Sequence, residues 1–284
     1  MPRVGRQGTA RIRLPLLLAA LILAAGPLTA DRVHRDALDR EVRLPDHPSR
    51  VIALAPNLAE IVWLLGESDR LVGRTENATH PEALTRLPSV GGMARPSLEA
   101  ILELRPDLVL ATTEGNDPGI ARRLEELGVP VFVVDRDSTG MDGVWLAVEQ
   151  TGIALGAGEA AEHLVSEGKR RLEAHRLSAP DERPRALLLV WTKPAVAAGP
   201  GTYVSDLLEA AGAVNAAEGI DLDWPQLGRE GIISLRPDLI LVADAMTGGP
   251  PPGIEDLENL PGLDARVVRV PGDPLLRPSP AALG

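Results

Sequence analysis

Three aromatic side chains stand where predicted strands end or predicted helices begin in the second half of the chain. Trp191 directly follows an apolar strand, Tyr203 follows the turn Gly199-Pro-Gly-Thr202, and Trp224 lies in a loop ahead of another helix. Flat ligands bind against such rings, and a small-molecule cleft needs apolar surface with a few polar groups. We therefore predict a cleft for a large flat ligand at this edge; the alternative is that Trp191 and Trp224 cap the sheet as part of the core.

Two glutamates, Glu99 and Glu230, occupy equivalent places in two similar segments. Each falls in the first turn of a predicted helix, where the helix dipole alone favours a carboxylate. Helices of this kind begin at the edge where the sheet strands end, so we expect one carboxylate on the outer rim of each half. A pair placed in this way suits a partner surface that carries two matching arginines.

Other residues that could do chemistry are scattered. His80 is a candidate metal ligand that stands alone in the sequence, whereas a metal site needs companion ligands beside an imidazole. Glu114 and Asp135 follow predicted strands and are the local candidates for the acid–base pair of an exported enzyme. The sequence contains no nucleophile elbow, zinc-protease, phosphate-loop or dinucleotide-binding motif, which lowers the odds of catalysis. The remaining histidines are expected to be solvated: His34, His47, His163 and His175.

An internal repeat predicts the elements that position these residues. The segment from Glu99 to Ala111 reappears from Glu230 to Val242, each reading as a short helix, an Arg-Pro-Asp turn and a continuous apolar strand. Such strands are typical of parallel sheets buried on both faces. Upstream strands at 50–55 and 185–190 complete the correspondence. The sequence thus predicts two small α/β lobes with mostly parallel sheets.

A helical segment separates the two halves. Residues 156–178 carry apolar side chains at helical spacing and form a predicted linker helix, which prolines at 180 and 184 terminate. A helix resists the bending that a loop permits, so the cleft between the lobes should be preformed. The predicted organisation is a leader at 1–30, an extension at 31–49, the first lobe at 50–155, the linker helix, and the second lobe at 179–284.

The composition limits partners and compartment. The 284 residues have a formal net charge of −11, which disfavours nucleic acid, and no cysteine, which excludes disulfides and thiolate metal sites. The first thirty residues place four arginines before an apolar run and small residues, as in a cleavable secretory signal. We therefore expect a soluble periplasmic protein that is not a lipoprotein; an uncleaved anchor is the alternative.

Several strings together resemble the helical-backbone metal receptors, which are the periplasmic binding proteins of ABC importers for cobalamin, haem and iron-siderophores. The resemblance covers residue 50 to the end. Its strings are Arg50–Glu60, Val90-Gly-Gly-Met93 running to Glu99 and Pro106-Asp107, Glu114-Gly-Asn116, Ala198–Tyr203, and Trp224-Pro-Gln226 running to Glu230. The Gly-Asn, Gly-Pro-Gly-Thr-Tyr and Trp-Pro-Gln strings most resemble the cobalamin-binding branch. The implied fold is the class III one, in which two Rossmann-like lobes are joined by a single long backbone helix.

The resemblance also implies site residues. Glu99 and Glu230 match the carboxylates that dock onto permease arginines, and Arg277 matches a ligand-side arginine. Cobalamin receptors often carry aromatics near Asn77 and at Thr112-Thr113, where this chain has none. The family usually adds a closing helix after Ser279-Pro280, whereas this sequence stops at Gly284. We expect either that the second lobe lacks this cover or that the sequence is shortened. The expected ligand-binding set is Pro56, Asn77, Thr113, Gly115, Asn116, Trp191, Tyr203, Trp224 and Arg277.

The expected function is capture of cobalamin or a related corrinoid and its delivery to an inner-membrane permease dimer with a cytoplasmic ATPase. The expected protein is a monomer without an intrinsic cofactor or enzymatic activity. Three alternatives remain open: a haem or ferric-siderophore receptor of the same fold, an exported enzyme on a two-lobed scaffold, and a sensor or scaffold that has lost its ligand.

Overall fold

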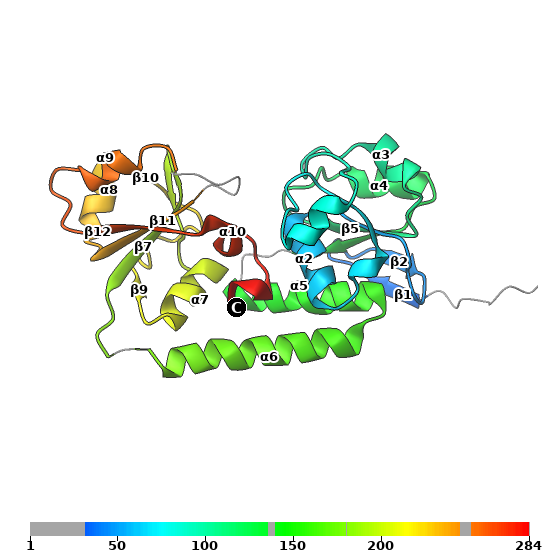
Figure 1. The fold of residues 1–284 in the computed structure, drawn as a ribbon, viewed down its shortest axis with the longest axis horizontal. Coiled ribbons are helices and arrows are strands. Elements are labelled where there is room, and N and C mark those ends of the chain that lie inside the picture. Colours follow the sequence, from blue (N-terminus) through cyan, green and yellow to red (C-terminus); the bar gives the residue numbers. More distant parts are fainter. Residues whose placement is uncertain (1–31, 136–139, 180, 245–250, 284) are drawn as a thin grey trace, which may run out of the picture.

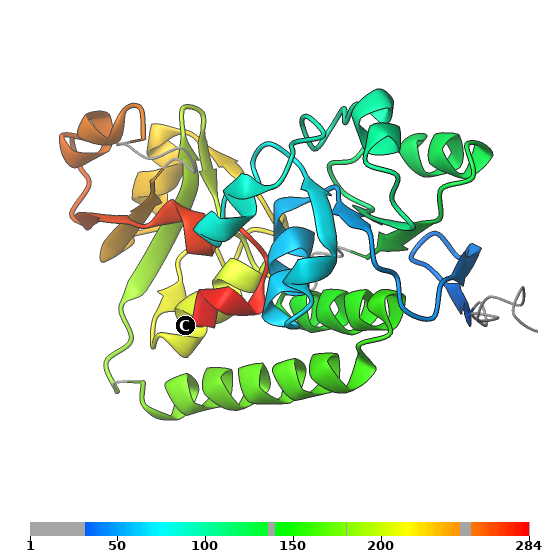
Figure 2. The same cartoon turned by 45° about the vertical axis from the view of Figure 1, so that its right-hand side comes forward.

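Two α/β lobes lie side by side over a helical base in a computed structural model, which describes residues 32–135, 140–179, 181–244 and 251–283 (Figures 1 and 2). The predicted leader, residues 1–30, lies outside the described residues. The two lobes confirm the predicted fold class. In the part of the chain that is described, no helix combines the length and the apolar character that crossing a membrane requires.

The sheet of the N-terminal lobe has four parallel strands in the order β4-β3-β5-β6. Its strands are β3 (Val51–Ala53), β4 (Leu71–Arg74), β5 (Leu108–Thr112) and β6 (Val131–Val134), and its helices are α2 (Pro56–Leu64), η1 (Ser68–Arg70), η2 (Glu82–Arg86), α3 (Leu98–Glu103) and α4 (Ile120–Glu126). Alternate residues of β5 enter two different core clusters, Leu108 and Leu110 one of them and Val109 and Ala111 the other. The uninterrupted apolar strands are therefore buried on both faces, as predicted.

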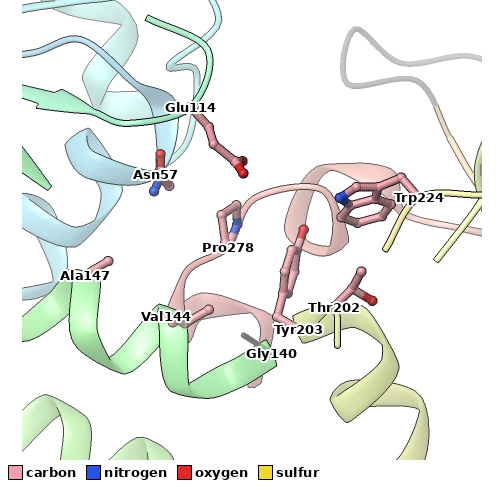
Figure 3. A pocket seen from close by; sticks show the side chains of 10 residues that line it. Asn57, Glu114, Gly140, Val144, Ala147, Thr202, Tyr203, Trp224 and Pro278 are labelled. Atoms are coloured by element: carbon pink, nitrogen blue, oxygen red, sulfur yellow. The ribbon is translucent and has the colours of Figure 1, made fainter. Parts of the chain in front are cut away.

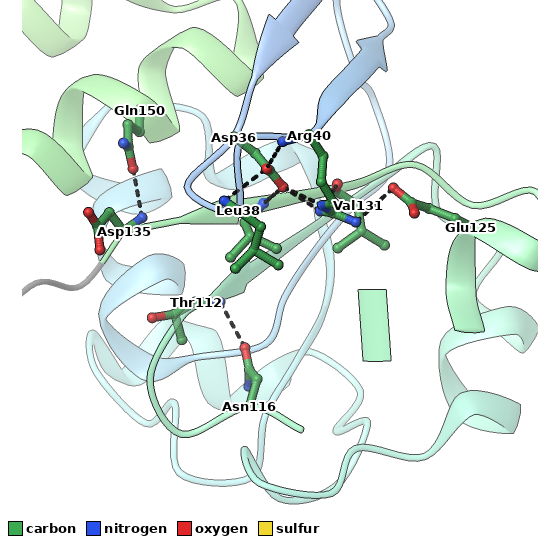
Figure 4. Close-up of polar contacts among 10 residues, drawn as sticks. Asp36, Leu38, Arg40, Thr112, Asn116, Glu125, Val131, Asp135 and Gln150 are labelled. Atoms are coloured by element: carbon green, nitrogen blue, oxygen red, sulfur yellow. Dashed lines mark hydrogen bonds and ion pairs between the residues drawn. The ribbon is translucent and has the colours of Figure 1, made fainter. Parts of the chain in front are cut away.

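A hairpin of β1 (Arg32–Arg35) and β2 (Glu41–Leu44) belongs to this lobe, although the sequence analysis set its residues apart as an extension. The side chain of Asp36 is fully buried and pairs with Arg40. The backbone N–H of Ala37 donates to the carbonyl oxygen of Val133 over 2.9 Å, and Arg40 reaches the carbonyl oxygen of Val131 at 3.2 Å (Figure 4). The turn of the hairpin thus covers the edge strand β6, which would otherwise expose unpaired backbone groups.

The sheet of the C-terminal lobe is mixed. Strands β7 (Arg185–Thr192), β9 (Val214–Asn215), β11 (Leu239–Ala243) and β12 (Arg266–Val270) run parallel, while β8 (Ala195–Ala197) and β10 (Gln226–Leu227) add an antiparallel edge. The helices are α7 (Tyr203–Ala210), α8 (Arg229–Ser234), α9 (Ile254–Glu258), α10 (Gly272–Leu275) and η3 (Pro280–Leu283). The antiparallel edge is the part of the sheet that the repeat does not contain, since it has no counterpart in the N-terminal sheet.

The Arg-Pro-Asp turns of the repeat have the same structural role in both lobes. The carboxylate of Asp107 accepts the backbone N–H of Arg50 at 2.8 Å, and that of Asp238 accepts the backbone N–H of Arg185 at 2.8 Å. Each aspartate also donates its own N–H to the carbonyl oxygen of the same arginine, at 3.0 and 2.8 Å. The motif therefore ties the end of a helix to the start of the neighbouring strand and sets the register of each sheet.

Two helices, rather than one, connect the lobes. The predicted linker at 156–178 corresponds to α6 (Gly158–Leu177), and α5 (Gly140–Leu155) lies beside it (Figure 1). A Cβ atom at Gly168 would stand 2.5 Å from the Trp145 ring, so the glycine lets the two helices pack closely. The first turn of α5 is fixed to the C-terminal lobe, because Asp206 of α7 accepts the N–H of Met141 at 2.7 Å. The rest of α5 packs under α2 of the N-terminal lobe.

Candidate functional site

A cleft lies between the two lobes, above α5 (Figure 3). The empty space between its walls is about 440 Å³, part of it open to solvent. The residues that line it come from both lobes and from α5: Asn57, Glu114, Gly140, Gly143, Val144, Ala147, Thr202, Tyr203, Trp224 and Pro278.

Small side chains on α5 form the base of the cleft. Gly140, Gly143, Val144 and Ala147 recur at helical spacing and so face the same side of the helix. Short side chains here leave room above the helix for a ligand. The sequence analysis placed this stretch in the first lobe and did not assign it to the site; a run of small residues is equally typical of helix packing.

Two aromatic rings form the wall contributed by the C-terminal lobe. Tyr203 is the first residue of α7, and Thr202 before it caps the helix by accepting the N–H of Ser205 at 3.2 Å. The Tyr203 hydroxyl donates to the carbonyl oxygen of Leu275 at 2.6 Å, which fixes the ring against the C-terminal segment. Trp224 is 41% exposed and stands beside Tyr203 (Figure 3). Two of the three predicted rings, Tyr203 and Trp224, therefore line the cleft.

The wall contributed by the N-terminal lobe is polar. Asn57, in the first turn of α2, is buried and lines the cleft, although the sequence analysis selected only its neighbour Pro56. The sequence signal that could have identified Asn57 is its position shortly after strand β3, at the start of α2. Glu114, in the turn after β5, is exposed and also lines the cleft (Figure 3). Asn57 and Glu114 therefore face the rings of Tyr203 and Trp224 across the gap.

Gly115 and Asn116 shape the turn that carries Glu114. The Asn116 side chain is buried; its amide oxygen accepts the N–H of Thr112 at 2.8 Å, and its amide nitrogen donates to the carbonyl oxygens of Leu54 and Met93 at 2.9 and 2.8 Å (Figure 4). Gly115 has a φ of +84°, which favours glycine. These two residues hold the loop in place, and neither is among the residues that line the cleft.

Other predicted ligand residues lie outside the lining. Trp191 is 52% exposed, and its indole N–H donates to the carbonyl oxygen of Lys193 at 2.9 Å. The hairpin that carries it is held by an ion pair of 2.8 Å between Lys193 and Asp256, and the hydrogen bond from Lys193 lowers the pKa of the Asp256 carboxyl. The remaining predicted residues that do not line the cleft are Pro56, Asn77, Thr113 and His80.

Arg277 is buried instead of facing the cleft. Its side chain is 4% exposed, and its guanidinium lies 3.5 Å from Oε1 of Glu60, whose side chain is 6% exposed. Glu60 belongs to α2 of the N-terminal lobe, whereas Arg277 follows α10 of the C-terminal lobe. The resemblance assigned Arg277 to the ligand side; in the structure it joins the two lobes. No local charge pattern predicts this ion pair, because Glu60 and Arg277 are 217 residues apart in the sequence.

The two acid–base candidates of the sequence analysis, Glu114 and Asp135, lie in different surroundings. Glu114 lines the cleft, whereas Asp135 accepts the Thr113 hydroxyl at 3.4 Å and its backbone N–H donates to Gln150 at 2.7 Å. Asp135 is not part of the lining. Within the described ranges, no group of three or more histidine and carboxylate side chains could hold a metal ion.

Glu99 and Glu230 lie apart from the cleft. Both are exposed in the first turn of a short helix, α3 in one lobe and α8 in the other. The two helices lie on the side of their sheets that faces away from α6 (Figure 1). Each lobe therefore offers one accessible carboxylate at an equivalent place.

Gly199 supports the Trp224 wall and provides a test of it. A methyl group at this position would overlap the carbonyl oxygen of Leu222, in the segment that leads to Trp224. We expect Gly199→Ala to lower the free energy of unfolding by about 1–3 kcal/mol and to weaken ligand binding, because the segment must move. Thermal melts and ligand titration measure both effects. Gly219→Ala, which meets nothing within 4 Å, is the control; equal effects from the two variants would contradict this account.

Known proteins resemble this chain over most of its length. Residues 51–265 match the family described as periplasmic binding protein. An uncharacterized ABC transporter substrate-binding lipoprotein of Bacillus subtilis, YvrC, is 30% identical over 227 residues, which cover 78% of this chain and 70% of that protein. A cobalamin-binding protein of Halobacterium salinarum is 33% identical over 213 residues, which cover 72% of this chain and 57% of that protein. The chain thus spans little more than half of the Halobacterium relative.

Solved structures share the architecture. The periplasmic haem-binding protein RhuT of Roseiflexus sp. RS-1, in apo form, is 27% identical and superimposes with a TM-score of 0.72 over 83% of this chain and 94% of that one. The family match spans strand β3 of the first lobe to the loop before β12 of the second, so it includes both walls of the cleft and the helices beneath it. This chain belongs to the periplasmic binding protein family.

Proposed function

We propose that this protein is the substrate-binding component of an ABC importer and that it captures cobalamin or a related corrinoid between its lobes. The observation that carries the proposal is the composition of the cleft, in which the rings of Tyr203 and Trp224 face the polar groups of Asn57 and Glu114. A corrin is a broad ring with an apolar face and a fringe of carboxamides. Aromatic side chains suit the ring, and an amide and a carboxylate suit the fringe.

Haem is the second candidate, and the likeness to the haem-binding RhuT favours it. Haem receptors need an axial ligand such as histidine or tyrosine. His80 is not among the residues that line the cleft, and the Tyr203 hydroxyl is engaged by the carbonyl oxygen of Leu275. The cobalamin-binding relative from Halobacterium supports the corrinoid over haem, and so does the fit of the polar wall.

The proposal extends to partners and location. Glu99 and Glu230 would dock onto two arginines of a permease dimer, whose ATPase subunits drive transport. The residues at 1–30 would direct export to the periplasm, and a sequence without cysteine has no residue to carry the lipid that the Bacillus relative's name implies. The protein would act as a monomer, without catalysis or an intrinsic cofactor.

Calorimetric titration with cyanocobalamin tests the proposed ligand. We expect saturable heat at micromolar concentrations with one ligand per chain. A parallel titration with haemin, followed by absorbance, should leave the Soret band of free haemin unchanged. Absence of heat with cyanocobalamin would remove the corrinoid, and a shifted Soret band on haemin addition would favour haem.

A further inference from the structure

We propose that the antiparallel edge of the C-terminal sheet carries a second subsite, which binds a planar heterocyclic base that the ligand holds outside its macrocycle. The inference rests on the proposed function and adds to it a preference for complete corrinoids. The subsite, which we call the Trp191 shelf, consists of Trp191 on β7, Val196 on β8 and Gln226 on β10. Trp191 lies opposite Val196, and Val196 lies opposite Gln226. Because directly opposed residues of antiparallel strands point to the same face, these three side chains form one row.

The row continues into the wall of the cleft. The N–H of Ala197 donates to the carbonyl oxygen of Pro225 at 3.0 Å, which extends the pairing of β8 and β10 by one residue. Trp224 precedes Gln226 by two positions along this extended segment, so both side chains lie on the same face. Trp224 also lines the cleft together with Tyr203. The shelf is therefore a continuation of the aromatic wall and not a separate patch.

Burial shows that the face of the shelf is the accessible one. Ala195 and Ala197, which flank Val196 and point to the other face, are 8% and 0% exposed and belong to a core cluster. On the face of the shelf, Trp191 is 52% exposed, Gln226 is exposed and Val196 is half-buried. An exposed indole next to a cleft that already contains two aromatic rings is an apolar surface available to a ligand.

The contacts of the β7–β8 hairpin hold the shelf in place. The indole N–H of Trp191 donates to the carbonyl oxygen of Lys193 at 2.9 Å, so the ring offers a ligand mainly its apolar surface. The Thr192 hydroxyl donates to the carbonyl oxygen of Pro252 at 2.5 Å, and the Lys193 ammonium pairs with Asp256 at 2.8 Å. A ring held in this way loses little freedom when a ligand stacks on it, which favours binding.

A complete corrinoid carries a group that suits this surface. Its nucleotide ends in a flat heterocyclic base, and such bases stack on aromatic side chains. The exposed amide of Gln226 can donate to or accept from the ribose and phosphate that join the base to the ring. Strands β7 and β10 are two strand spacings apart, about 10 Å, so one large ligand can contact the shelf and the cleft wall together. Haem and cobinamide lack the base.

A segment of the permease is the competing occupant. Strand β7 begins near the end of α6 and runs away from it, so Trp191 lies on the side of the lobe that faces away from α6, as α8 with Glu230 does (Figure 1). The ligand is favoured because the row includes Trp224, which lines the cleft. The two occupants differ in what loss of the ring changes: ligand affinity in one case, and uptake at unchanged affinity in the other.

Paired titrations of the intact protein test the inference. Cyanocobalamin and dicyanocobinamide share the corrin ring and its carboxamides, but only the first carries a nucleotide. We expect the wild-type protein to prefer cyanocobalamin, and Trp191→Ala to weaken cyanocobalamin binding by about tenfold while changing cobinamide binding by about twofold at most. Trp191→Phe keeps a ring and should retain most of the preference. Trp63→Ala, which removes a 37% exposed indole on α2 outside the cleft lining, is the matched control and should leave both affinities unchanged.

The outcomes separate this inference from the proposed function. A narrowed ratio of the two affinities in Trp191→Ala, with the melting temperature of the wild-type protein, would support the shelf. If the wild-type protein binds cyanocobalamin and Trp191→Ala binds both corrinoids as the wild type does, the shelf is wrong and the corrinoid assignment stands; lost uptake in that variant would then assign Trp191 to the permease. Equal losses for both corrinoids would place Trp191 against the macrocycle and overturn the preference for a base. If the wild-type protein binds neither corrinoid, the proposed function fails and this inference fails with it.

Discussion

Replacing Glu60 by alanine is expected to lower the free energy of unfolding by about 3–5 kcal/mol, because it removes a buried carboxylate that lies 3.5 Å from the buried guanidinium of Arg277. The two side chains are 6% and 4% exposed and join different lobes. For a chain of this size the loss corresponds to a fall of about 10 °C in melting temperature. Thermal unfolding followed by circular dichroism measures it. The variant should also bind ligand less well, since Asn57 precedes Glu60 by one turn and Pro278 follows Arg277, and both line the cleft.

A double replacement distinguishes the contribution of the ion pair to stability from the contribution of side-chain packing. Breaking a buried pair costs more than replacing both members with apolar residues of similar size. Glu60→Leu with Arg277→Met should therefore be more stable than Glu60→Ala alone. Glu60 Oε2 is buried and lacks a hydrogen-bond partner within the described structure, which further reduces the net value of the intact pair. The control is Glu167→Ala on α6, which removes a carboxylate that is 31% exposed and paired with Arg170, and which should change stability far less. Equal losses from Glu60→Ala and Glu167→Ala would contradict a buried clamp.

Reversing the charge of both rim carboxylates is expected to abolish uptake while leaving ligand affinity unchanged. Glu99→Arg with Glu230→Arg would place two cations opposite the permease arginines, and like charges at an interface exclude a partner. Both residues are exposed and lie outside the cleft, so binding should be spared. Accumulation of labelled cyanocobalamin in cells that carry only the variant measures transport, and calorimetry on the purified variant measures affinity.

A matched variant controls for the change in net charge. Glu162→Arg with Glu173→Arg alters the charge by the same amount on exposed positions of α6, on the opposite side of the molecule from α3 (Figure 1). This control should transport at the wild-type rate. Wild-type uptake by the Glu99, Glu230 variant would exclude these residues from docking, and equal losses in both variants would assign the effect to total charge.

The repeat explains why the fold could be predicted from the sequence. An Arg-Pro-Asp turn between a short helix and an apolar strand is a local signal, and its two copies fall 131 residues apart both in the sequence and in the elements α3–β5 and α8–β11. Because Asp107 bonds to Arg50, just before strand β3, and Asp238 bonds to Arg185, the first residue of strand β7, the motif also determines strand pairing. The rings of Tyr203 and Trp224 were predictable for a related reason, since each stands next to a turn of recognisable composition.

The parts that escaped prediction depend on contacts between distant segments. The sequence gives no local sign that Glu60 meets Arg277 or that Asp206 holds the start of α5, because each pair joins different lobes. Asn116 was chosen for its place at a strand end, but whether its side chain faces a ligand or the backbone depends on a buried geometry that the chain acquires only when folded. The hairpin of β1 and β2 was set apart because short polar strands resemble an extension until they meet an edge.

These contacts bear on how the protein would bind. The cleft is bounded by a base fixed to both lobes, with α5 held by Asp206 on one side and packed under α2 on the other. The buried pair of Glu60 and Arg277 joins the lobes a second time. Such a cleft is organised before the ligand arrives, which reduces the ordering cost of binding.

A crystal structure of the protein grown with cyanocobalamin tests the central claim most directly. We predict corrin density above α5, with the rings of Tyr203 and Trp224 on one side and the carboxylate of Glu114 within hydrogen-bonding distance of a corrin carboxamide. An empty cleft in crystals from a saturating solution, or the corrinoid bound to another surface, would contradict the assignment of this cleft as the binding site.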